Sequence, residues 1–113
     1  MSDDCLFCGI VAGDIPATIV HESDSTVAFR DINPQAPTHV VVVPRAHYAD
    51  AASLAQADPA LAGAVLAAAS AVADQEGLPD YRLVLNKGEG AGQTVFHVHC
   101  HVLGGRPMTW PPG

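Results

Sequence analysis

The chain has 113 residues, a formal net charge of -7 and only five lysine or arginine residues. This length suits one compact domain with its own core. Five basic residues offer no positive stripe for a nucleic acid backbone. No apolar run approaches the roughly 20 residues of a membrane span, and no basic segment precedes an apolar stretch at the start. We therefore expect a single domain over residues 1–113, cytoplasmic, with neither a nucleic acid polymer nor a membrane as partner.

The first half of the chain predicts one short helix and three strands. The helix ends at Gly13, and a turn at residues 23–25 joins the first two strands into a hairpin. The third strand is apolar at almost every position and is closed by Pro44, as expected of a central strand covered on both faces. The predicted elements are a helix at residues 5–12 and strands at residues 18–22, 26–32 and 39–43.

The second half predicts one long helix between two caps, followed by two strands. Asp58 caps a helix that begins at Pro59, and Gly77 stops it. Strands are predicted at residues 81–86 and 95–103, with a glycine-rich loop between them and a proline-containing tail after them. Six apolar residues at helical spacing predict the helix face that packs on the sheet: Leu61, Val65, Leu66, Ala69, Val72 and Ala73.

Three histidines alternate along the last predicted strand. Side chains of a strand point to opposite faces in turn, so His97, His99 and His101 are expected to share one face, with valine and cysteine on the core side. Imidazole has a pKa near 6.5, so it is mostly a neutral nucleophile or base at neutral pH. A neutral histidine can attack a phosphate, and its neighbours can offset charge on the phosphoryl oxygens. The row therefore predicts phosphorus chemistry.

The loop before this strand carries glycine at residues 88, 90 and 92. Such a backbone can approach an anion and direct amide groups at it. Gln93 and Thr94 add side-chain donors, and Asn86 is a polar residue at the end of an apolar strand. Each residue taken singly is equally typical of an ordinary loop. The signatures of nucleoside triphosphatases, metallopeptidases and serine hydrolases are absent, so the predicted catalysis depends on histidine.

The segment from His97 to Leu103 resembles the motif of the histidine-triad family. Residues 31–39, Asn86, residues 92–94 and the tail from residue 104 resemble its Hint branch. The resemblance implies an α+β, HIT-like fold with a five-stranded antiparallel sheet, one long helix and a short N-terminal helix. It also implies a homodimer that hydrolyses purine nucleoside phosphoramidates and related nucleoside monophosphate conjugates through a nucleotidyl-histidine intermediate, without a cofactor for catalysis.

The same resemblance implies a role for each matching residue. The implied catalytic group comprises His99 as nucleophile, His101 and His39 at the phosphate, His97 as support for the row, and Thr94 near the leaving group. The implied substrate contacts are Phe7 and Ile32 at the base, Asp31 at the ribose, Asn86, Gly92 and Gln93 at the phosphate, and Trp110 of the neighbouring subunit. The family usually has serine where Thr94 stands, and Asp31 is equally typical of a turn cap.

Two cysteines near the start, Cys5 and Cys8, have the C-x-x-C spacing of half a zinc site. His47 and His97 would complete four tetrahedral ligands, as in some bacterial members of the family. Such a zinc ion would be structural, because four protein ligands leave no open position. The alternative is that both cysteines are buried thiols, as is expected of Cys100.

Two other classes of function fit the same residues. One is a nucleotide-sensing adaptor that binds its ligand with little turnover. The other is a zinc-stabilised structural module that uses the histidines only as ligands. A measurement of turnover distinguishes the adaptor from an enzyme. Metal analysis of His99→Ala and His101→Ala tests the structural module, because full zinc retention in both variants would rule out these residues as ligands.

Overall fold

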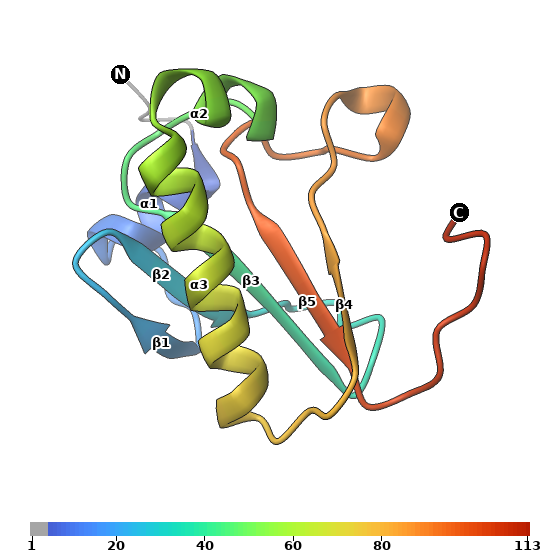
Figure 1. The fold of residues 1–113 in the computed structure, drawn as a ribbon. Helices are drawn as coiled ribbons and strands as arrows, with labels where there is room; N and C mark the ends of the chain where they lie inside the picture. Colours follow the sequence, from blue (N-terminus) through green and yellow to red (C-terminus); the bar gives the residue numbers. More distant parts are fainter. Residues whose placement is uncertain (1–4) are drawn as a thin grey trace.

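The computed structural model describes residues 5–113. Residues 1–4, over which the sequence predicts no leader, lie outside the described residues. A five-stranded antiparallel sheet in the order β1-β2-β3-β5-β4 has α3 on one face and α1 on the other (Figure 1). The strands are β1 (Ile19–Glu22), β2 (Thr26–Arg30), β3 (Thr38–Pro44), β4 (Tyr81–Val84) and β5 (Cys100–Gly104). The helices are α1 (Leu6–Ala12), α2 (Ala51–Ala57) and α3 (Pro59–Gln75).

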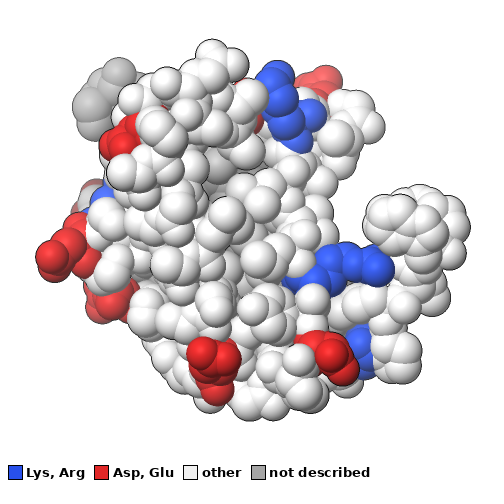
Figure 2. Space-filling view, viewed as in Figure 1, with Lys and Arg blue, Asp and Glu red and all other residues white. Residues whose placement is uncertain are grey.

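The surface over α3 is almost free of charge. Figure 2 shows Lys, Arg, Asp and Glu side chains around its margin, and a hollow between the body of the molecule and the C-terminal tail. Asp74 is the one charged residue within α3. Among residues 5–113, no helix has the length and apolar character needed to cross a membrane.

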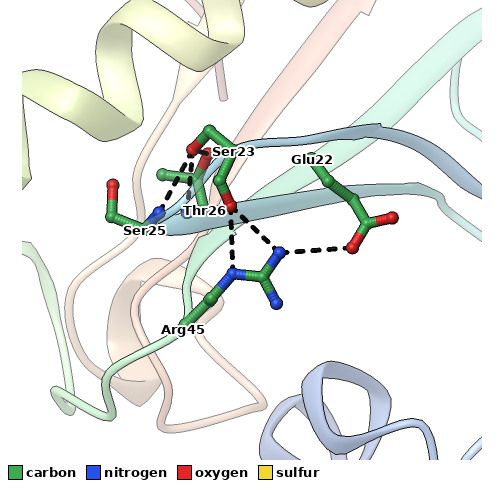
Figure 3. Close-up of polar contacts among 5 residues, drawn as sticks. All are labelled: Glu22, Ser23, Ser25, Thr26 and Arg45. Carbon is green, nitrogen blue, oxygen red and sulfur yellow. Dashed lines mark hydrogen bonds and ion pairs between the residues drawn. The ribbon is translucent and has the colours of Figure 1, made fainter.

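The predicted hairpin of β1 and β2 is confirmed, and its turn is tied to the end of β3 (Figure 3). The Ser23 hydroxyl accepts the backbone N–H groups of Ser25 and Thr26. Arg45, directly after β3, donates its Nε to the Ser23 carbonyl at 3.1 Å and pairs with Glu22 at 3.2 Å. These contacts hold the segment that leaves β3, which contributes His47 to the candidate site.

β3 lies at the centre of the sheet and is covered on both faces, as predicted. Val40 and Val42 pack with α3, whereas Val41 and Val43 pack with Phe7 from α1. Alternate side chains of one strand thus belong to two separate parts of the core.

β5 is shorter than the predicted strand at residues 95–103. It pairs with β3 in a register that places Cys100 opposite Val42. Two residues further along, this register would set Val98 against Pro44, which has no N–H to donate. Val98 instead donates its N–H to the carbonyl of Tyr48 at 2.7 Å. The sheet ladder therefore begins at Cys100, after two of the three histidines.

The long helix α3 is confirmed with its predicted caps. Asp58 accepts the Leu61 N–H at 3.0 Å, and Pro59 is the first helical residue. The predicted packing face is wrong at one position, because Leu66 is 47% exposed and Ala68 is buried instead.

Both predicted helices are present, and the described residues contain a further one, α2, that the sequence did not predict. Asp50 caps α2 by accepting the Ser53 N–H at 2.8 Å. β4 also ends at Val84 rather than Asn86, and a 3₁₀ turn, Glu89–Ala91, lies inside the glycine-rich loop.

Candidate functional site

The three histidines project from one face of the chain as it enters β5. Val98, Cys100 and Val102 between and beyond them lie in the core on the α3 side. The ring centroids of His99 and His101 are 4.9 Å apart. The predicted one-sided row is therefore confirmed, although only His101 lies within the strand.

His99 is held with its proton on Nδ1. This nitrogen lies 2.8 Å from the carbonyl oxygen of His97, which can only accept a hydrogen bond. The neutral ring therefore keeps a lone pair on Nε2. Burial lowers the pKa of His99, although its hydrogen bond to the carbonyl and the charge of Asp31 act in the opposite direction. The geometry therefore favours an uncharged His99 with a lone pair on Nε2.

His39 and His101 form a hydrogen-bonded pair whose proton positions are also set. The Gln35 N–H donates to His39 Nδ1 at 3.1 Å, so a neutral His39 carries its proton on Nε2. That proton is donated to His101 Nδ1 at 2.9 Å. The remaining proton of a neutral His101 is therefore on Nε2. Burial first, then the charges of His99 and His39, lowers the pKa of His101 to about 4.

Asp31 lies beside this pair at the end of β2. Its Oδ1 accepts the Asn33 N–H at 2.8 Å, which is the turn-capping contact considered from the sequence. Its Oδ2 lies 3.5 Å from His39 Nε2. An ionised carboxylate accepts several hydrogen bonds, so both contacts leave it able to accept further donors.

A pocket of about 330 Å³ opens beside His99 and His101. Its volume lies in the range of small-molecule sites, about 300–1,000 Å³. Six predicted site residues line it: Phe7, Asp31, Ile32, Thr94, His99 and His101. Most of the remaining wall is apolar, and Ile32 is 98% exposed. The arrangement combines an apolar chamber with a few convergent polar groups, which is typical of ligand sites.

The sequence did not single out Leu6 and Ile10, which also line this pocket. They belong to α1 and lie four residues apart, a spacing that places two side chains on one face of a helix. The same spacing in the sequence could have identified this wall.

Gln93 lies inside the protein rather than at the pocket. It is 1% exposed, and its Oε1 accepts the Gly88 N–H at 2.8 Å. Its Nε2 donates to the carbonyls of Ala49 and Val95. The expectation of a donor for a bound phosphate is therefore corrected, because this amide braces the loop. Thr94, the next residue, lines the pocket.

Three other residues that were predicted to contact the substrate lie outside the pocket wall. Asn86 is half-buried, with its amide beside Gly92. Gly92 has a φ of +95°, a left-handed conformation that glycine adopts without strain. Trp110 is 82% exposed on the C-terminal tail, which leaves the body of the molecule (Figure 1).

Cys5, Cys8, His47 and His97 form a second cluster beside the histidine row. Their candidate ligand atoms all lie within 4.8 Å of one another. His97 Nε2 lies 2.8 Å from the Pro44 carbonyl, so its proton is there and the Nδ1 lone pair faces both thiols at 3.4 Å. A histidine that ligates a metal usually donates its other N–H in this way. The donor set therefore fits a tetrahedral zinc site.

Comparison with known proteins gives matches over almost the whole chain. A model of the HIT domain matches residues 12–108. A HIT-like protein of Synechocystis sp. is 47% identical over 114 residues, 100% of both chains. A 14 kDa zinc-binding protein of Zea mays is 46% identical over 112 residues, 96% of this chain and 87% of that protein. The crystal structure of a HIT family hydrolase from Legionella pneumophila has a TM-score of 0.92 and 50% identity, and the match covers 96% of this chain and 99% of that one.

Proposed function

The chain belongs to the HIT domain family, and we propose that it is a hydrolase of purine nucleoside phosphoramidates and related nucleoside monophosphate conjugates, of the Hint branch. The observation that carries the proposal is the pair of His99 and His101 at the pocket wall. One ring has a lone pair on Nε2 and the other a proton on Nε2. Similar solved structures from Legionella pneumophila and Clostridium thermocellum are named HIT family hydrolases, which supports the reaction class.

The proposed reaction has two displacements at phosphorus. His99 Nε2 attacks the phosphorus atom, forming an N–P bond while the bond to the leaving amine breaks. The leaving amine takes up a proton from water, while the Nε2–H of neutral His101 donates a hydrogen bond to a phosphoryl oxygen and offsets the charge that develops there. Water then attacks the same phosphorus atom, the N–P bond to His99 breaks, and the proton lost by the attacking water returns to the solvent. The products are an amine and a nucleoside monophosphate. His99 regains its lone pair on Nε2, and His101 keeps its proton throughout.

The pocket supports one orientation of the substrate. Phe7 and Ile32 provide apolar surface for a purine, and the Asp31 carboxylate can accept hydrogen bonds from a ribose diol. Thr94 would then face the leaving group, with the Gly92 backbone and Asn86 on the phosphate side. Gln93 has a positioning role in this arrangement, because its amide is used within the loop.

Turnover of an adenosine phosphoramidate by two His99 variants tests the proposal. His99→Ala removes the ring, and His99→Asn keeps a side-chain N–H for the His97 carbonyl but lacks the nucleophile. Both should lower kcat by at least about 10³-fold while the fold is unchanged. His21→Asn, a histidine on β1, is the matched control. Unchanged turnover in the His99 variants contradicts the proposal, whereas tight binding of AMP without turnover in the wild type indicates the nucleotide-sensing adaptor.

We further propose that the four-residue cluster holds a structural zinc ion. Cys5, Cys8, His47 and His97 would be its ligands, and the ion would supply a cross-link rather than a reaction step, since four protein ligands leave no open position. The zinc-binding relatives of Zea mays and Brassica juncea support the choice of metal. Metal analysis of the purified protein is expected to find about one zinc per chain. Purified protein that contains no zinc would contradict this proposal.

A further inference from the structure

The helix α1 belongs to both the metal cluster and the substrate pocket. Cys5 caps α1 and Cys8 lies within it, and the sulfur atoms of both lie 3.4 Å from His97 Nδ1. Cys8 also lies 3.3 Å from the ring of His47, which follows β3. A metal in this cluster would therefore join α1 to the segments that follow β3 and precede β5.

The same helix presents its apolar side chains to the pocket. Phe7, between the two cysteines in sequence, lies edge to face with His99 at 5.0 Å between ring centroids. It also packs against Phe29 at 5.4 Å. A helix of seven residues is marginal by itself, so its position depends on such tertiary contacts.

A second connection runs through the backbone of His97. Its side chain faces the thiols through Nδ1 and is anchored to the Pro44 carbonyl through Nε2. Its own carbonyl oxygen accepts the Nδ1 proton of His99 at 2.8 Å. One residue therefore contributes a ligand atom to the cluster and fixes the tautomer of the nucleophile.

We propose that metal binding at this cluster and nucleotide binding in the pocket are energetically coupled, with Phe7 and His97 as the connecting, positioning residues. The inference rests on the proposed function, since it concerns the affinity of the same pocket. Metal in the cluster holds α1 against the pocket and the His97 carbonyl against His99. Loss of the metal releases both constraints, so nucleotide binds more weakly.

The experiment measures AMP binding to the full chain by calorimetry, with zinc bound and after its removal by a chelator. AMP is expected to bind at least about fivefold more weakly without zinc, and saturating AMP should raise zinc affinity by the same factor, because coupling is reciprocal. ¹⁵N NMR of the histidine rings gives a readout independent of turnover. The Nδ1–H form of His99 should lose its dominance when zinc is removed.

His47→Asn separates the metal from the pocket wall. His47 is exposed, and its contacts are with Cys8 and His97 rather than with the pocket. The variant should lose at least about tenfold in zinc affinity and bind AMP as weakly as the metal-free wild type. His21→Asn makes the same substitution on β1 and should behave as the wild type.

Each alternative outcome has one meaning. AMP affinity that is equal with and without zinc overturns the coupling but leaves the proposed function intact. Zinc-loaded protein that binds no AMP overturns the proposed function itself. Global unfolding after zinc removal, seen by circular dichroism, also overturns the coupling, because the metal would then hold the whole fold. A cluster that takes up no zinc overturns it as well.

Discussion

His99 and His101 differ in which ring nitrogen carries the proton. A backbone carbonyl holds the proton of His99 on Nδ1, whereas a backbone N–H and the His39 ring leave that of His101 on Nε2. His99 is therefore a neutral base and His101 a neutral donor, and their ring centroids are 4.9 Å apart. Neither ring buries a charge. Within residues 5–113, no buried side-chain nitrogen or oxygen lacks a hydrogen-bond partner. Burying these rings is thus compatible with a stable fold.

Replacement of His39 tests the chain of hydrogen bonds behind His101. His39→Leu removes the donor to His101 Nδ1, so the proton of His101 is no longer confined to Nε2. We expect kcat to fall by about 10²-fold with a smaller change in KM. His39→Gln keeps an N–H near the position of Nε2 and should recover part of the loss. Steady-state kinetics of both variants provide the measurement, and equal rates in the two would contradict this role.

Burial of the histidines also predicts how stability depends on pH. The pKa of His101 is about 4 in the folded protein and about 6.5 in an unfolded chain. Between these values the unfolded chain binds a proton that the folded chain does not, so the free energy of unfolding falls as the pH drops from 6.5 to 4. Thermal unfolding across this range should show the decline. His101→Asn should decline less steeply, and parallel curves would rule out this contribution.

Alternation in the sequence was sufficient to predict the histidine row, but not the role of Gln93. The row follows from a local rule, the two-residue period of an extended chain. The placement of Gln93 depends on carbonyls supplied by distant or neighbouring backbone, including that of Ala49. Such contacts exist only after the chain has folded, so a polar residue in a loop gives no indication that it will be buried.

Among the elements, those with strong end signals were predicted well. Gly13 ends α1, and Asp58 with Pro59 begins α3. The missed helix α2 has seven residues and follows Asp50, whose capping contact is a comparable signal. A stretch this short shows no clear helical period, so the sequence pattern alone does not predict it. The start of β5 depends on its pairing with β3, where Pro44 interrupts the ladder, and this register is not visible in the sequence of β5 alone.

Gln93 fixes the loop that precedes the histidine row. Gln93→Ala leaves the Gly88 N–H and two carbonyls without their partner. We therefore expect the free energy of unfolding to fall by about 2 kcal/mol. Turnover should also fall, because the loop positions Thr94. Urea denaturation and kcat of the variant measure both effects. Thr94→Ser keeps the hydroxyl and serves as control; a Gln93→Ala protein of wild-type stability would show that the loop does not need this brace.

For the whole molecule, we propose that two chains associate into a homodimer. Leu66 and Leu85 line an apolar hollow of about 200 Å³ between α2, α3 and the end of β4. A larger hollow of about 760 Å³ lies between the body and the C-terminal tail. The exposed Trp110 on this tail is free to meet a neighbouring chain, as the family resemblance implies.

Analytical ultracentrifugation measures this association. We expect a species of twice the monomer mass of 11.7 kDa. Leu66→Lys places a charge on the apolar surface and should weaken dimerisation by at least about tenfold. Ile19→Lys, at a similarly exposed apolar residue of β1, should not. A wild-type protein that stays monomeric at high concentration contradicts the proposal.

The proposed mechanism depends on a covalent bond between His99 and the phosphorus atom of the substrate. Rapid quenching of the protein with an adenosine phosphoramidate, followed by mass spectrometry of its peptides, would detect this bond. We predict one added adenylyl group on His99 in the wild type and none in His99→Asn. Turnover without such an adduct, or an adduct on a different residue, would contradict the proposed mechanism.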